Sequence, residues 1–234
     1  MPRPTIPERR TTLLDVAERL VLERGFDRVS VQDVATAAGV AKGAVYLEFS
    51  SKHELLDALL RRATARLGER VRTRTEGSAG GLAEVYRAGT DELLADPLMR
   101  AAVLDDRAVL GRHTRQVGGD RYRERLGWLR DYLRALHDAG RLQPGVDPDA
   151  AALALSVTTV GLLSAPALLG PLGDHELSSA LDVVATLLAR GLDAPAAPVA
   201  TQDSPLPRLL DALHHQVTDA RPTDDKPTDD PERT

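Results

Sequence analysis

Residues 31–50, VQDVATAAGVAKGAVYLEFS, have the pattern of two short helices joined by a tight turn. Ala35 is small, which lets the second helix cross close to the first, and Val45 faces the core that the two helices share. Gly39 can take a positive φ at the turn without steric cost. In the DNA-binding form of this helix-turn-helix, the second helix enters the major groove.

Helix signals continue on both sides of this motif. Apolar residues at helical spacing predict a helix over residues 8–24, which Gly25 ends. The S-x-x-D pattern of residues 30–33 is a capping box for the first helix of the motif. A second box, residues 51–54, opens a long helix that we expect to reach about Arg74 and to link the motif mechanically to the rest of the chain.

Composition restricts the class of protein. The 234 residues are 42% hydrophobic but only 3% aromatic, which favours a core of Leu, Ala and Val built from helices. The absence of Cys excludes disulfides, thiol catalysis and Cys-ligated zinc. No apolar run reaches membrane-spanning length without Gly, Pro or polar breaks, and MPRPTIPERR has no signal-peptide core. We therefore expect a soluble cytoplasmic protein with no membrane contact.

Charge is distributed unevenly along the chain. Residues 1–70 hold 12 Lys and Arg against 10 Asp and Glu, whereas residues 192–234 hold 4 against 9. The net charge of −5 therefore hides a weakly basic N-terminal part, which fits DNA contact at one end only. Arg3, Arg9 and Arg10 either lie against phosphates or belong to a solvated terminus.

The remainder of the chain is predicted to be helical, with no strand signal. Residues 111–119 are expected to form a loop, and residues 192–234 a Pro- and Asp-rich tail. Within the tail, residues 205–217 either dock as a short amphipathic helix or form only a nascent one. The other predicted helices span residues 82–95, 97–110, 120–139, 148–169 and 174–190.

No pattern indicates enzyme chemistry. None of the six His residues belongs to a nucleophile or metal-ligand motif, and His214 and His215 are adjacent, which is poor spacing for chelation on a helix. Gly-rich phosphate loops and the G-x-S-x-G elbow are absent. We predict no catalytic residues, no metal and no cofactor.

The segment from Thr12 to Leu60 resembles the N-terminal domain of the tetracycline-repressor (TetR) family. The match rests on Gly25-Phe26, Ser30-Val31, Val34-Ala35, Ala38-Gly39-Val40, Lys42-Gly43, Tyr46, Phe49, Ser51-Lys52 and Leu55-Leu56. It covers about a quarter of the chain. Glu48 departs from the family pattern, and we expect its side chain to point away from DNA.

The resemblance implies an all-α fold with three parts. Residues 8–68 would be a three-helix DNA-binding domain with its helix-turn-helix at 31–50. Residues 69–191 would be a larger helical ligand-binding and dimerisation domain, and residues 192–234 the tail.

Several residues near the motif have side chains or backbone groups suited to DNA. Cationic and hydroxyl groups can pair with phosphates, the start of a helix favours a phosphate, and small residues let the backbone approach the groove. Tyr46 contacts either DNA or the core, because its neighbours are apolar; the resemblance favours DNA. The predicted DNA contacts are Arg28, Ser30, Val31, Gln32, Lys42, Gly43, Ala44, Tyr46 and Lys52.

One DNA-binding domain makes few contacts with DNA, so we expect a homodimer on an inverted-repeat operator in double-stranded DNA. The apolar surface of the last two strong helices is either monomer core or the dimer interface, and the resemblance favours the interface. The predicted interface residues are Leu153, Val157, Val160, Leu177, Leu181, Val184 and Leu188.

The resemblance also implies a small-molecule site between the central helices, suited to an apolar or aromatic effector. Its predicted lining is Tyr86, Met99, Leu104, Leu110, His113, Trp128, Tyr132 and Thr159, each of which could instead be plain core or surface. The leading hypothesis is a ligand-released repressor. The alternatives are an activator, a regulator controlled by a protein partner through residues 205–217, or a helical enzyme or carrier that reuses the fold.

Overall fold

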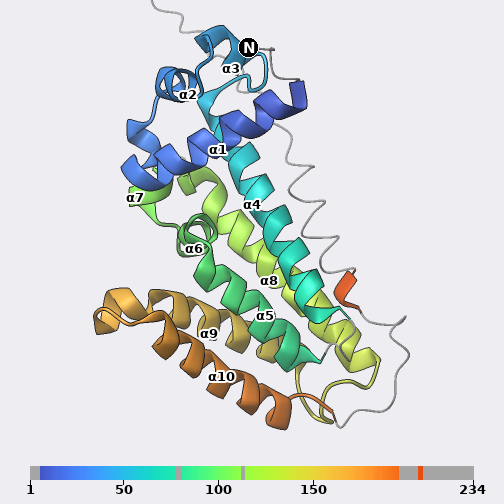
Figure 1. Ribbon diagram of the computed structural model, residues 1–234. Coiled ribbons are helices and arrows are strands. Elements are labelled where there is room, and N and C mark those ends of the chain that lie inside the picture. Colours follow the sequence, from blue (N-terminus) through green and yellow to red (C-terminus); the bar gives the residue numbers. More distant parts are fainter. Residues whose placement is uncertain (1–5, 77–80, 112–113, 195–204, 208–234) are drawn as a thin grey trace, which may run out of the picture.

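The computed structural model describes residues 6–76, 81–111, 114–194 and 205–207 (Figure 1). Within these ranges the chain is helical, and the only extended pairing is an isolated bridge between Leu142 and Asp193. The predicted all-α fold class is confirmed.

The first elements form a head, which comprises α1 (Ile6–Arg24), the 3-10 turn η1 (Phe26–Arg28), α2 (Val31–Ala37), α3 (Lys42–Tyr46) and the start of α4 (Lys52–Thr75). The signals read from the sequence act as expected. The Ser30 side chain accepts from the backbone N–H of Asp33, and the Asp33 side chain accepts from that of Ser30. Gly39 turns the chain between α2 and α3 with φ 68°.

The core of the head is filled by the residues that the motif predicts. Val34 and Ala35 of α2 are 0% exposed, and Val45 of α3 is 1% exposed. Because these side chains pack on α1 and α4, α3 is held with its opposite face outward.

Helix α4 leaves the head and runs along the body (Figure 1). The body consists of α5 (Leu82–Ala95), α6 (Pro97–Leu104), α7 (Arg107–Leu110), α8 (Thr114–Asp138), α9 (Pro148–Leu169) and α10 (Asp174–Gly191). In Figure 1, α9 and α10 lie at the end of the molecule opposite to α2 and α3.

Two predicted boundaries are wrong. The single helix expected over 97–110 is two helices, because Asp105 adopts a left-handed conformation with φ 51° and Asp106 then caps α7. The loop expected over 111–119 is helical from Thr114 onward. Glycine in a helix costs only about 1 kcal/mol per residue, so the glycines that suggested a loop do not stop a 25-residue helix that packs on α9.

Two buried clusters divide the core along α4. The first joins the head to residues of α6 and α7, and the second joins the lower half of α4 to α5, α8 and α9. The division expected at residue 68 thus falls inside one continuous helix. Leu206 is buried in the second cluster, so the tail docks on the body at this position; residues 208–217 of the predicted tail helix lie outside the described ranges.

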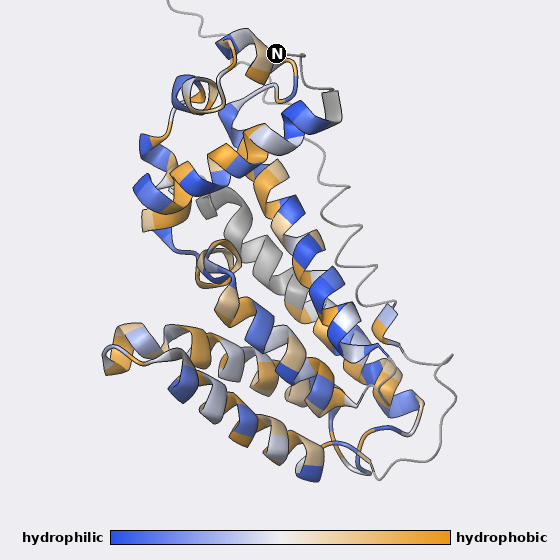
Figure 2. Cartoon of the chain, in the orientation of Figure 1, coloured by the Kyte–Doolittle hydropathy of each residue, from blue (hydrophilic) through white to orange (hydrophobic). Residues whose placement is uncertain are grey.

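Helix α9 is unusually apolar for its exposure. It is long and apolar enough to cross a membrane by length and composition alone, yet only 17% of its most apolar window is buried within the chain. Leu153 and Val157 are 48% and 60% exposed on α9, and Val183 and Leu187 are 60% and 65% exposed on α10. Figure 2 shows hydrophobic residues recurring along both helices. We call these four side chains the α9–α10 apolar face.

Candidate nucleic-acid interface

A hollow on the surface of the head collects most of the predicted DNA contacts. It lies where η1, the start of α2, α3 and the start of α4 meet. Gly43 and Ala44 do not line it, but they share the short helix α3 with two residues that do. Asp27 and Val29 also line it and were not predicted. The predicted residues that line the hollow are Arg28, Ser30, Val31, Gln32, Lys42, Tyr46 and Lys52.

The side of the hollow at the start of α2 is built by hydrogen bonds. Hydrogen bonds from the Ser30 side chain and backbone N–H lower the pKa of Asp33, so that carboxylate stays charged and fixes the cap. The Gln32 amide donates to the Thr36 hydroxyl at 3.2 Å. Val31 differs from the prediction: its side chain is 8% exposed and belongs to the core, so only its backbone can face a phosphate.

Lys52 is the cation most constrained by the fold. Its Nζ lies 4.2 Å from the centre of the Phe26 ring and donates to the Asp27 carbonyl oxygen at 3.4 Å. Burial lowers the pKa of Lys52, and the nearby carboxylates of Asp27 and Asp33 oppose that shift. An anion in the hollow would therefore stabilise a partly desolvated ammonium.

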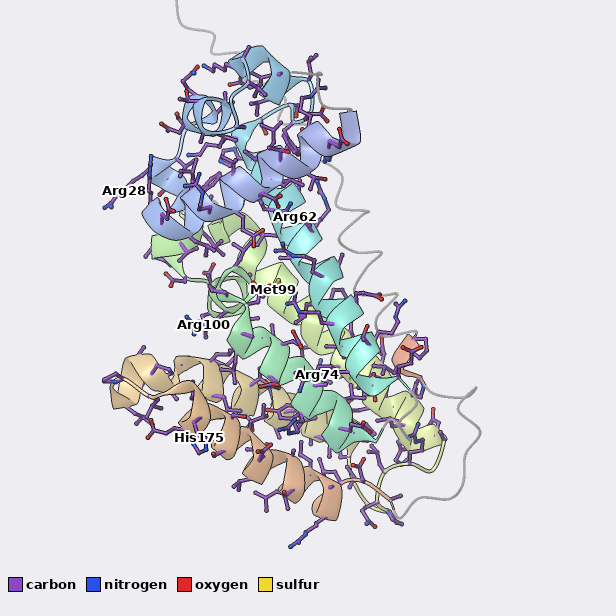
Figure 3. All side chains as sticks on the ribbon, viewed as in Figure 1. Arg28, Arg62, Arg74, Met99, Arg100 and His175 are labelled. Atoms are coloured by element: carbon purple, nitrogen blue, oxygen red, sulfur yellow. The ribbon has the colours of Figure 1, made fainter. Side chains whose placement is uncertain are left out.

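Lys42 and Tyr46 form the α3 side of the hollow. Tyr46 is 47% exposed, whereas Val45 and Phe49 are 1% and 2% exposed and fill the core. The core alternative for Tyr46 is therefore wrong. The Lys42 ammonium lies 5.9 Å from the Tyr46 ring centre. Across the hollow, Arg28 projects from the edge of the head (Figure 3).

Arg9 and Arg10 are engaged within the protein, contrary to the possibility that they lie against phosphates. The Arg9 guanidinium donates to the Glu48 carboxylate at 2.9 Å through Nε. Arg10 donates to the Glu48 carbonyl oxygen at 2.7 Å and stacks over Phe49 at 4.4 Å. Glu48 is thus paired with α1, and these contacts fix the end of α3.

Helix α4 is tied to both of its neighbours by four arginines at a four-residue spacing, of which Figure 3 labels Arg62 and Arg74. In the head, Arg62 pairs with Asp15 and Glu18 of α1, and Arg66 pairs with Glu18, all at 2.7 Å. In the body, Arg70 and Arg74 pair with acidic residues at the end of α5 and at Asp96. One line of arginines, which winds around α4, therefore holds the head at one end and the body at the other.

The body also touches the hollow directly, through α7. A Cβ atom on Gly25 would lie 2.2 Å from the Ala108 carbonyl oxygen, and one on Gly111 would lie 2.2 Å from the Asp27 carboxylate. Both glycines have positive φ, at 81° and 70°. Since Asp27 lines the hollow, this close approach is a second contact between body and interface, besides α4.

The predicted ligand-lining residues are split between the two cores. The Thr159 hydroxyl donates to the Tyr86 hydroxyl at 3.1 Å, and burial raises the pKa of Tyr86. Tyr132 is 3% exposed in the same cluster, and its hydroxyl has no hydrogen-bond partner among the described residues. Met99 and Leu110 instead belong to the core of the head, Leu104 and Trp128 are half-buried, and His113 lies outside the described ranges.

The predicted dimer residues divide in the same way. Leu177 and Leu181 are 7% and 1% exposed, and Leu188 packs against the second core, because this line of α10 faces the body. The exposed line of α10 is Val183 and Leu187, which the sequence analysis missed. On α9, Leu153 and Val157 are exposed as the interface prediction requires, and Val160 is intermediate, as is Val184 on α10. In the described ranges, no group of three acidic or His residues is placed to hold a metal ion.

Comparison with known proteins finds a family match within the head. Residues 13–59 match the family model described as bacterial regulatory proteins, tetR family. The HTH-type transcriptional repressor KstR2 of Rhodococcus jostii is 47% identical over 53 residues, which cover 23% of this chain and 26% of that protein. The chain therefore matches about a quarter of the length of this curated relative.

Solved structures extend the likeness to the whole fold. FadR of Bacillus subtilis in complex with stearoyl-CoA aligns with a TM-score of 0.61 at 21% identity, over 77% of this chain and 98% of that one. AibR in complex with isovaleryl coenzyme A and operator DNA aligns with a TM-score of 0.52 at 23% identity, over 74% and 96%. At these identities the likeness describes the fold.

Proposed function

We propose that the chain is a transcriptional repressor of the tetR family that binds a specific operator and is released by a small molecule, because its N-terminal domain matches that family over residues 13–59. The hollow on the head carries the proposal. It brings Arg28, Lys42 and Lys52 together with the start of α2, so one surface offers both cations and helix N–H groups to a phosphate backbone. The described residues offer no comparable arrangement for catalysis.

We propose that the active form is a homodimer joined through the α9–α10 apolar face. Four large side chains on that face are between 48% and 65% exposed in one chain. A second copy related by a twofold axis would cover the face with its own equivalent and would present two α3 helices to one side of the DNA. The operator is then an inverted repeat, with half-sites one helical turn apart or somewhat more, about 34–36 Å in simple cases. Such a regulator works in the cytoplasm, with α9 covered by protein and not by lipid.

We place the effector site in the second core, beside Tyr86, Thr159 and Tyr132. These residues bring three hydroxyl groups to the second core, and the Tyr132 hydroxyl lacks a partner among the described residues. An apolar or aromatic compound with one polar group suits such a site. Coenzyme A thioesters, bound by FadR and AibR, are the first class to test.

Release follows from linkage. An effector that binds better to the arrangement in which the two heads do not match the operator must weaken operator binding by the same factor. The four arginines of α4 and the seat of α7 on Asp27 are the contacts through which the body can move the head.

A second candidate is a regulator controlled by a protein partner that binds the tail. It is favoured by the buried Leu206, because one residue of the tail packs against the second core. The Asp193 carboxylate accepts from the N–H groups of Leu82 and Ala83, at 2.8 and 3.1 Å, so removal of residues 192–234 would expose the start of α5. Deletion of residues 208–234 is the cleaner test: a retained effector response supports the small-molecule proposal.

Selection from a library of randomised DNA duplexes tests the proposal, with the purified full chain at near-physiological salt. We expect enrichment of one inverted repeat. The matched control is the double charge reversal Lys42→Glu with Lys52→Glu, which should enrich nothing. Failure of the natural chain to enrich any sequence, with and without coenzyme A thioesters, would contradict operator binding.

A further inference from the structure

A large apolar side chain stands on the outer face of α3. Leu47 is 78% exposed, more than any other large hydrophobic residue of the head in the described ranges. Its backbone continues the helix, with φ −71° and ψ −24°, and its N–H donates to the carbonyl oxygen of Gly43 at 3.1 Å. The position of Leu47 around the helix axis can therefore be read from helix geometry.

Leu47 lies opposite the core. Successive residues of a helix are 100° apart, so Leu47 is about 200° from the buried Val45. Gly43 is one turn earlier on the same outward line, and nothing lies within 4 Å of where its Cβ would be. The outward ridge of α3 thus has no side chain at Gly43 and a leucine at position 47.

Charged and polar groups lie beside this ridge. Lys42 and Tyr46 line the hollow on one flank, together with Lys52. When those cations rest on phosphates, the ridge beside them faces the major groove. A leucine there cannot donate or accept a hydrogen bond. The C5-methyl group of thymine is the apolar feature that base edges offer in that groove.

We propose that Leu47 is a specificity-determining residue that reads a thymine methyl group in each operator half-site. The inference rests on the proposed function, because it needs a specific operator. Burial of one methyl group is worth about a fourfold change in affinity for each half-site.

The test replaces each thymine of the selected operator in turn, symmetrically in both half-sites, by deoxyuridine, which removes only the methyl group. Fluorescence anisotropy then compares the natural chain with Leu47→Ala. At one thymine position per half-site we expect deoxyuridine to weaken binding by the natural chain about 15-fold for the pair, and to leave Leu47→Ala unaffected. Leu22→Ala, which changes an exposed leucine of α1, should keep the full sensitivity to deoxyuridine.

The outcomes separate the two proposals. An operator bound tightly but indifferent to deoxyuridine at every position overturns the role of Leu47 and leaves the repressor proposal standing. Equal losses for the natural chain and Leu47→Ala also overturn it, because the methyl group is then read by another residue. Absence of any specific operator overturns both.

Discussion

Replacing Lys52 by methionine separates its electrostatic role from its packing role. Methionine keeps an unbranched stem and a polarisable group over the Phe26 ring, from which the ammonium now lies 4.2 Å away. The substitution removes only the charge and the hydrogen bond to the Asp27 carbonyl oxygen. Since burial lowers the pKa of Lys52, the folded protein gains little from this charge, and thermal stability should change little.

The magnitude follows from counterion release. Each phosphate neutralised contributes about 0.9 to the slope of log affinity against log salt concentration, so loss of one lysine from each head of a dimer reduces the slope by about 1.8. Between 50 and 200 mM salt the ratio of natural to variant affinity should then fall by about 12-fold. The variant is thus most impaired at low salt.

Fluorescence anisotropy of a labelled operator duplex, titrated at four salt concentrations, measures both slopes. Arg190→Met, at the far end of α10, is the control and should leave the slope unchanged. A slope for Lys52→Met equal to that of the natural chain would refute the reasoning. Lys52 would then serve only as a cover for Phe26.

Three further predictions concern assembly and stability. Leu187→Asp should convert the dimer to a monomer in sedimentation experiments without loss of helical circular dichroism. The control Ala189→Asp, on the other side of α10, should remain a dimer. A dimeric Leu187→Asp would argue against the α9–α10 apolar face as the interface. Gly111→Ala should lower the free energy of unfolding by at least about 1–3 kcal/mol, because the backbone at this position, with φ 70° and ψ −166°, suits only glycine and the new Cβ would meet Asp27. The control Gly127→Ala, with open space around it in α8, should be neutral or stabilising. Ser30 lowers the pKa of Asp33 from its ordinary value of 3.8, so the stabilising contribution of Asp33 is complete above pH 3.8 and is lost as the pH falls through the lower folded pKa. Urea unfolding should therefore show a shallower loss of stability in acid for Ser30→Ala than for the natural chain. Identical acid profiles would contradict this.

Local signals explain why the head could be predicted from the sequence. Both capping patterns, the turn glycine Gly39 and the buried residues Ala35 and Val45 each depend on a few neighbouring residues. These signals agree with one another, so α2, α3 and the turn between them follow from the sequence. The stacking of Lys52 on Phe26 could not be predicted in this way, because it joins residues 26 positions apart through tertiary packing.

In the body, tertiary contacts determine which helix faces are buried and where the helices break, and local sequence does not. Helix α10 carries two apolar lines, one with Leu177 and Leu181 and one with Val183 and Leu187, and only the position of α5 decides which is buried. The break between α6 and α7 depends on Asp105 taking a left-handed conformation, which aspartate tolerates but does not signal. The sequence indicates the effector residues only by their position along the helices, and the packing puts Met99 and Leu110 in the core of the head.

If the proposed function is right, the head binds one particular DNA sequence through α3 and the hollow beside it. The most direct measurement is the ratio of two dissociation constants at near-physiological salt, for the selected inverted repeat and for a scrambled duplex of the same composition. The account predicts that the repeat binds at least about 10³-fold more tightly. Equal affinities, falling together as salt is raised, would mean that the head only attracts phosphates and would contradict the account.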